Sequence, residues 1–166
     1  SVMLSVVDDF KDYQFVIAGA PSQDFSFYQQ FIKTDNVQFI NNKTYDLLSV
    51  SFAALVTSGT ATLETALFKV PQVVCYKGSA ITYAIAKRII TLKFISLVNL
   101  IMDREVVTEL IQSDFNTKTL TKELTKILDE SHREKVFLEY YELEKILGGK
   151  GASAESARLI IEGITE

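Results

Sequence analysis

The sequence of 166 residues has few of the side chains that several common classes of protein need. A single cysteine, Cys75, excludes a scaffold held together by disulfide bonds. A single histidine, His132, leaves no set of His and Cys ligands for a zinc site, so we expect no bound metal. No apolar run approaches the ~18 residues of a membrane-spanning helix. The first ten residues lack the basic start and apolar core of a secretory signal, so we expect a reducing, cytoplasmic location.

Two common nucleotide-binding motifs are also absent. The chain has no P-loop pattern, and no Gly-x-Gly-x-x-Gly follows an apolar run. A net charge of −4 argues against a nucleic-acid partner. Residues 76–110 carry 5 basic and 3 acidic groups, a surplus of +2 that suits either an anionic ligand or an ordinary mixed-charge surface.

What the sequence does contain is an alternation of short apolar runs with helical segments, in a chain that is 48% hydrophobic and 23% charged. The runs are continuously apolar, which is typical of strands buried on both faces of a parallel sheet. Their centres lie 17 to 22 residues apart, which leaves room for one crossover helix between strands. The predicted strands are Gln14–Ala18, Val37–Ile40, Ala53–Thr57, Gln72–Tyr76 and Phe94–Leu97.

The remaining segments have helical spacing. The predicted helices are Val2–Phe10, Ser26–Lys33, Thr44–Ser51, Ala61–Lys69, Ile81–Ile90, Arg104–Gln112, Thr119–Leu128, Ser131–Leu147 and, after a break at Gly148–Gly151, Ser153–Ile164. The pattern predicts a Rossmann-like α/β fold, with an open, mostly parallel sheet, flanking helices and a helical C-terminal tail. Because a helix precedes the first strand, we expect residues 1–112 to be an α/β domain lacking its first strand, cut from a longer protein. Residues 113–166 then form the C-terminal helices.

The most informative stretch is Ala53–Tyr76, which has the order strand, turn, helix, strand. Gly59 allows a tight turn, and Ser58 or Thr60 begins the helix. Such a helix start offers N–H groups and a partial positive charge to a phosphate. Glu64 lies one turn later on the same face, where its carboxylate suits the two hydroxyls of a ribose. The alternative is an ordinary capped helix with an exposed glutamate.

A second group of polar residues follows the strand predicted at Phe94–Leu97. That strand would deliver Asn99 to the same edge of the sheet, and Asp103, Arg104 and Glu105 would begin the next helix. Arg104 suits bidentate pairing with a phosphate, although a surface cluster of charges at a helix start has the same pattern.

Together these stretches resemble the C-terminal half of the lipid-A-disaccharide synthase family, glycosyltransferase-B-type enzymes of Gram-negative bacteria. The matching segments are SGTATLETALFKVPQVVCYK, TYAIAKRI and FISLVNLIMDREVVTELIQ. The resemblance implies transfer of 2,3-diacylglucosamine from its UDP-linked form to 2,3-diacylglucosamine 1-phosphate, with release of UDP and without a cofactor. It implies that Ser58, Gly59 and Thr60 face the diphosphate and Glu64 the ribose. By the same resemblance, Tyr76 lies near the uracil or sugar, while Asn99 and Arg104 frame the nucleotide pocket.

The resemblance also implies what lies outside this sequence. The acceptor site and catalytic base belong to an N-terminal domain, so we expect no catalytic residue here and no transfer by this chain alone. We expect the whole protein to lie at the inner membrane, and the last helix to exchange between the chains of a homodimer. The sequence departs from many family members at Val98, where they have proline, and at Lys77–Ala80, where they have an arginine and a proline.

Two other interpretations fit parts of the sequence. Another UDP-sugar transferase or epimerase of the same architecture would share Ser58–Glu64 but not Asn99–Glu109. A non-catalytic α/β interaction domain would bind no nucleotide. The segment Ile81–Ile90, with Lys87 and Arg88, suits either packing on the sheet or contact with anionic lipid. Cys75 is expected to be a buried, inert thiol, and His132 a surface residue.

Overall fold

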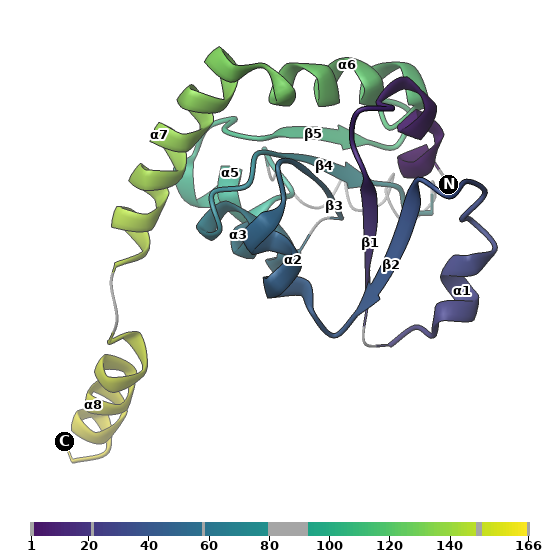
Figure 1. Ribbon diagram of the computed structural model, residues 1–166. Coiled ribbons are helices and arrows are strands. Elements are labelled where there is room, and N and C mark those ends of the chain that lie inside the picture. Colours follow the sequence, from purple (N-terminus) through teal and green to yellow (C-terminus); the bar gives the residue numbers. More distant parts are fainter. Residues whose placement is uncertain (1, 21, 58, 80–92, 149–150, 166) are drawn as a thin grey trace.

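A computed structural model describes residues 2–20, 22–57, 59–79, 93–148 and 151–165. Five strands alternate with helices, as Figure 1 shows. The strands are β1 (Phe15–Gly19), β2 (Val37–Asn41), β3 (Ala54–Thr57), β4 (Gln72–Tyr76) and β5 (Thr108–Ile111). The helices are η1 (Val2–Asp9), α1 (Phe25–Gln29), α2 (Thr44–Val50), α3 (Thr60–Leu67), α5 (Leu97–Met102), α6 (Thr117–Leu128), α7 (Glu130–Leu147) and α8 (Ala152–Thr165).

Every strand pairing in the described chain is parallel, which confirms the predicted α/β class. β1 pairs with β2, and β3, β4 and β5 form a second sheet in that order. Central β4 is the strand that the continuous apolar run describes best, because its residues from Gln72 to Cys75 are all buried. Parallel pairing places the carboxyl ends of β3, β4 and β5 at one edge of the sheet.

Alternate side chains of β4 point into two separate cores. Val73 and Cys75 pack with Leu120 and Leu124 of α6 and with Val6 of η1. Val74 packs on the opposite face, in a core built from α3, α5 and α7 that includes Ala66, Val98, Met102 and Tyr140. Figure 1 shows the same layers, with α6 on one side of the three-stranded sheet and α3 and α5 on the other. Helix α3 therefore packs against α5 in this core.

Two predicted elements after residue 93 are wrong. Residues 94–97 form no strand, because the Ser96 hydroxyl accepts a hydrogen bond from the Asn99 N–H and caps α5. Residues 104–112 form no helix, since Thr108–Ile111 pairs in parallel with Val73–Tyr76 as strand β5. Both segments are short, so their periodicity fits either element and tertiary contacts decide between them.

The other elements agree with expectation to within a few residues, except that Val2–Asp9 is a 3-10 helix. The predicted helix Ile81–Ile90 lies outside the described residues. Among the residues that are described, no helix is long and apolar enough to cross a membrane.

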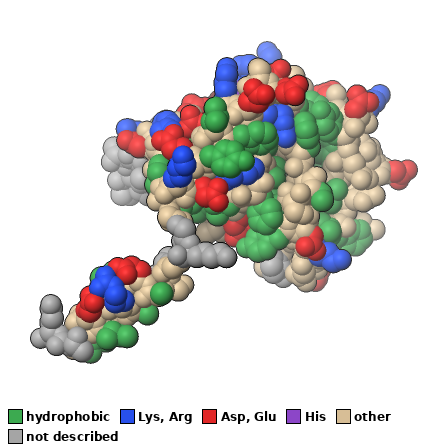
Figure 2. Space-filling model, turned by 60° about the vertical axis from the view of Figure 1, so that its left-hand side comes forward, with side chains coloured by type: hydrophobic (Ala, Val, Ile, Leu, Met, Phe, Trp, Pro, Cys, Tyr) green, Lys and Arg blue, Asp and Glu red, His purple; other side chains and the backbone are tan. Residues whose placement is uncertain are grey.

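Helix α8 extends away from the rest of the chain after α7 (Figure 1). Figure 2 shows its charged side chains on one side and hydrophobic side chains on the other. Arg158 pairs with Glu155 and Glu162 on the charged side. Leu159, Ile160 and Ile164 are all more than half exposed. This helix therefore has the amphipathic pattern of one that packs against another surface.

Candidate functional site

The turn between β3 and α3 lies at the carboxyl edge of the sheet and depends on Gly59. Its backbone has φ 131° and ψ −163°, a conformation open essentially to glycine alone. Gly59 is also the residue that precedes the helix, and it has no side chain with which to cap the first N–H groups. Its carbonyl accepts hydrogen bonds from the Thr62 N–H at 3.2 Å and the Thr62 hydroxyl at 2.8 Å. The turn thus leaves the start of α3 open to an anion.

Glu64 lies one turn into α3, on the same face as exposed Thr60. Its side chain is half-buried, and its carboxylate has no hydrogen-bond or ion-pair partner among the described residues. A carboxylate accepts hydrogen bonds only, so it suits a ligand that presents hydroxyl groups. Gly59, Thr60 and Glu64 are therefore brought together as the sequence predicts. Ser58 lies outside the described residues.

Tyr76 is the last residue of β4, and its side chain is exposed at the same edge. The following turn is close to it, because a Cβ atom added to Gly78 would lie 3.0 Å from the Tyr76 hydroxyl oxygen. The Tyr76 carbonyl accepts a hydrogen bond of 2.9 Å from the Gln112 N–H. β4 and β5 thus end side by side, with Tyr76 and Gln112 in contact through their backbones.

Gln112 is a residue of this edge that the sequence analysis did not single out. Its side-chain oxygen accepts a hydrogen bond of 3.2 Å from the Gly78 N–H. Its Nε2 is buried and has no hydrogen-bond partner in the described structure. Its φ of 53° lies in the left-handed region, which is uncommon for a residue other than glycine. Neither feature has a signal in the sequence, because both depend on the pairing of β4 with β5.

Asn99 lies in α5 rather than at the end of a strand, and it is fully buried. Its oxygen accepts hydrogen bonds from the N–H groups of Val106 and Val107, at 2.8 and 3.0 Å. Its nitrogen donates to the Val107 carbonyl at 2.8 Å and to Glu109 at 2.9 Å. Every hydrogen-bonding position of the amide is therefore used within the protein. Since Val107 precedes the first residue of β5, this amide faces the amino end of that strand and not the edge where Tyr76 lies.

Glu109, on β5, completes the same network. Its two carboxylate oxygens accept hydrogen bonds from the N–H groups of Ile95 and Ser96, both at 2.9 Å. The carboxylate thus occupies the amino end of α5 and holds it against β5. The sequence gives no sign of this role, because residues 94–97 have the pattern of a strand.

Arg104 also differs from the expected placement, since it begins no helix. Its guanidinium donates to Glu139 from Nε at 3.0 Å and from Nη2 at 2.6 Å, and to Glu142 at 2.5 Å. These two carboxylates raise the pKa of the arginine further. Both belong to α7, so Arg104 ties the segment before β5 to that helix.

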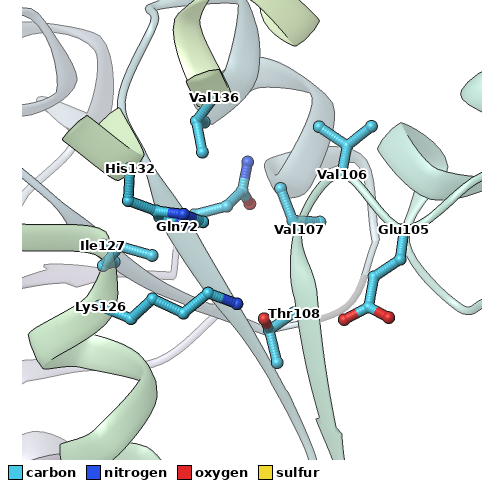
Figure 3. Close-up of a pocket in the computed structure, with 9 residues that line it drawn as sticks. All are labelled: Gln72, Glu105, Val106, Val107, Thr108, Lys126, Ile127, His132 and Val136. Carbon is cyan, nitrogen blue, oxygen red and sulfur yellow. The ribbon is translucent and has the colours of Figure 1, made fainter. Parts of the chain in front are cut away.

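Figure 3 shows a separate pocket of about 260 Å³ at the amino ends of β4 and β5. Gly59 instead follows the carboxyl end of β3. Gln72 and Thr108, the first residues of β4 and β5, line the pocket together with Lys126, Glu105 and His132. His132, expected at the surface, is partly exposed, and desolvation is the main reason that its pKa is lowered. The Gln72 nitrogen donates to the Thr62 carbonyl at 2.8 Å, and its buried oxygen has no partner in the described structure.

The expectation for the Cys75 side chain can be compared directly with the structure. Cys75 is buried, as predicted, and burial raises the pKa of its thiol to about 12. In the described part of the chain, no three His, Cys, Asp or Glu side chains gather in a group that could hold a metal ion.

Comparison with known proteins gives one consistent result. The family model for lipid-A-disaccharide synthetase matches residues 4–161. A lipid-A-disaccharide synthase of Anaeromyxobacter dehalogenans is 33% identical over 154 residues, which cover 90% of this chain and 40% of the relative. The synthase of Syntrophus aciditrophicus is 38% identical over 148 residues, covering 87% and 39% of the two chains. This chain therefore spans about two fifths of the length of these relatives and belongs to the lipid-A-disaccharide synthetase family.

Proposed function

We propose that this chain is the donor-binding part of a lipid-A-disaccharide synthase and that it binds a UDP-linked sugar at the carboxyl edge of β3 and β4. The observation that carries the proposal is the start of α3 at Gly59, which has no side-chain cap, with the Glu64 carboxylate one turn away and without a partner among the described residues. Parallel α/β sheets bind ligands at this edge. Membership of the family supports a UDP-sugar over other nucleotides.

In this proposal the diphosphate, the ribose and the uracil or sugar are bound by different residues. The N–H groups of the first turn of α3, with Ser58, Gly59 and Thr60, bind the diphosphate, whose charge the helix dipole stabilises. Glu64 accepts hydrogen bonds from the ribose hydroxyls. Tyr76 lies against the uracil or sugar. Asn99 and Arg104 frame the pocket indirectly, because they hold α5 and α7, which pack behind α3.

The whole protein would transfer 2,3-diacylglucosamine to the hydroxyl group of 2,3-diacylglucosamine 1-phosphate. The acceptor oxygen forms the new bond to the anomeric carbon as the bond to UDP breaks. The acceptor proton passes to a base that we assign to an N-terminal domain outside this chain. We therefore propose that the chain alone binds donor but does not catalyse transfer.

The acylated substrates indicate where the whole enzyme works, and the exposed apolar side chains of α8 indicate how it assembles. We propose that the whole enzyme works at the surface of the inner membrane, where its lipid substrates reside. Leu159, Ile160 and Ile164 suit a helix that exchanges between two copies of the chain. This arrangement predicts a homodimer.

Calorimetric titration with UDP, and with AMP as the comparison ligand, tests the nucleotide proposal. We expect saturable binding of UDP and much weaker binding of AMP. Glu64→Gln should weaken UDP binding roughly tenfold or more, because a hydrogen bond to a charged group contributes about 1.5–3 kcal/mol. Glu134→Gln, which removes an exposed carboxylate on α7, is the matched control.

The 2′-deoxy form of UDP separates a ribose contact from a general charge effect. If Glu64 binds the ribose, the Glu64→Gln substitution should weaken the binding of 2′-deoxy-UDP less than it weakens the binding of UDP. Equal binding of UDP by the original chain and Glu64→Gln would contradict the assigned role. Absence of UDP binding by the original chain would overturn the proposed function.

A further inference from the structure

We propose that Gln112 is a ligand-binding residue of this site and that its side-chain N–H donates a hydrogen bond to a carbonyl oxygen of the nucleotide base. The inference rests on the proposed function and deepens it, because it names a residue and a contact that determine base specificity. Gln112 follows β5 directly, at the edge where Tyr76 ends β4.

The orientation of the Gln112 amide follows from its neighbours. The Gly78 N–H is a donor, so the side-chain oxygen of Gln112 must be the atom that faces it, at 3.2 Å. The opposite orientation would place two donors against each other. Nε2 therefore points away from Gly78, where it is buried and has no acceptor in the described structure.

Two unfavourable features coincide at this one residue. A buried N–H without an acceptor loses the hydrogen bond to water that it has in the unfolded chain. A φ of 53° adds backbone strain to a residue that has a side chain. Such costs persist where surrounding contacts impose them, and they gather at binding sites. Here the contacts are the bonds from Gln112 N to the Tyr76 carbonyl at 2.9 Å and from Gly78 N to the Gln112 side chain. A ligand that supplies an acceptor would remove one of the two costs.

The position in the sheet indicates which part of the ligand meets Gln112. β5 is two strands away from β3, so the end of β5 lies about 10 Å from the start of α3, given ~4.8 Å between strands. If the diphosphate binds at Gly59, the group near Gln112 is at the other end of the nucleotide. A neutral amide donor suits an uncharged carbonyl oxygen there, which uracil provides. Because Nε2 is buried, the contact requires a small displacement of the atoms that cover it.

The substitution Gln112→Glu tests the proposal with little change in shape. It keeps an oxygen for the Gly78 N–H and replaces the N–H donor with a second acceptor. We expect the 166-residue variant to unfold at nearly the same temperature and to bind both UDP and uridine at least about tenfold more weakly, the scale for loss of a hydrogen-bond donor in a binding site. Pyrophosphate, which lacks a base, should lose much less affinity. Gln38→Glu, an exposed position on β2, is the matched control for added charge.

A second measurement uses the unaltered chain and does not depend on the variant folding. In ¹⁵N-labelled protein, the side-chain NH₂ resonances of Gln112 should shift on addition of uridine as well as UDP. Binding of UDP without a shift of these resonances, or with unchanged affinity in Gln112→Glu, would overturn this inference and leave the proposed function intact. A loss of pyrophosphate affinity as large as that of uridine would overturn the assignment to the base. Failure of the unaltered chain to bind UDP would overturn both proposals.

Discussion

The side-chain amide of Asn99 and the carboxylate of Glu109 are joined by a hydrogen bond of 2.9 Å, and together they connect α5 with the start of β5. Asn99 accepts hydrogen bonds from the N–H groups of Val106 and Val107. Glu109 accepts them from the N–H groups of Ile95 and Ser96. The pair thus fixes the backbone on both sides of α5, at residues 95–96 before the helix and at residues 106–107 after it. Val98 and Met102 of α5 lie in the same core as Ala66 of α3, the helix that begins at the candidate site.

Replacing Asn99 with alanine should strongly destabilise the fold. The N–H and carbonyl of buried Val107 would lose their partners, and each unsatisfied buried group costs about 1–3 kcal/mol. We expect the free energy of unfolding to fall by about 2–4 kcal/mol in urea denaturation. Asn36→Ala is the control, because its partly exposed side chain donates one hydrogen bond, to the Tyr13 carbonyl. Similar losses in the two variants would contradict the central role of Asn99.

Substitutions at Arg104 and its partners test whether this arginine holds α7 or contacts the ligand directly. Because its guanidinium pairs with Glu139 and Glu142, Arg104→Ala and the double substitution Glu139→Gln, Glu142→Gln should lower the melting temperature by similar small amounts. The effect should shrink at high salt, since these groups are partly exposed. We expect UDP affinity to be unchanged in both variants. A loss of affinity in Arg104→Ala alone would instead place the guanidinium on the nucleotide.

Gly59 should tolerate no side chain, although the space around it is open. A Cβ atom there would meet nothing within 4 Å, so the cost arises from the backbone at φ 131°. We expect Gly59→Ala to lower the free energy of unfolding by about 1–3 kcal/mol, or to shift the turn and weaken UDP binding. Gly163→Ala in α8 also adds a methyl group in open space, but at an ordinary helical φ, and should be neutral or stabilising. Equal stability of Gly59→Ala and the original chain, with unchanged UDP binding, would rule out this role for the turn.

Cys75 should be inert in the native protein. Its thiol is buried on β4, and burial raises its pKa from 9.0 to about 12, so almost no thiolate forms near pH 8. Labelling with a thiol-specific reagent at pH 8 should be slow in buffer and fast in urea. Rapid labelling of the folded chain would show that the thiol is accessible.

The same pKa shift makes stability depend on pH. Between pH 9.0 and about 12 the unfolded chain has released the Cys75 proton and the folded chain has kept it. The free energy of unfolding should therefore fall as the pH rises above 9.0, by up to about 1.4 kcal/mol per pH unit. This slope should be smaller in Cys75→Ala, and an equal slope in the two proteins would contradict the shift.

The sequence predicts the parallel α/β class and four of the five strands, because continuously apolar runs such as Gln72–Tyr76 have a clear pattern. It fails where contacts with other segments decide between helix and strand. TELI becomes a strand only through its pairing with β4, and the segment before Asn99 becomes a helix start because Ser96 caps it and Glu109 binds its N–H groups. The strand pairing and the Glu109 contact join residues 13 or more positions apart, so local periodicity contains no trace of them.

Some residues of the candidate site can likewise be predicted from local sequence, and others cannot. Gly59 and Glu64 are predictable because a glycine between a strand and a helix, with a carboxylate one turn later, has a local chemical meaning. The pattern places Asn99 at the sheet edge and Arg104 at a helix start, yet both side chains are committed to contacts inside the protein. Gln112 was not named at all, since its left-handed backbone and unpaired nitrogen exist only once β5 pairs with β4.

The most direct test of where nucleotide binds is a titration of the ¹⁵N-labelled chain with UDP, followed by backbone amide shifts, with AMP as the control. Saturable shifts should appear at Gly59, Thr60 and Glu64 and along Tyr76–Gly78, and they should be strongly reduced in Glu64→Gln. Shifts confined to the pocket lined by Gln72 and His132, or equal responses to AMP and UDP, would contradict a UDP site at the carboxyl edge of the sheet.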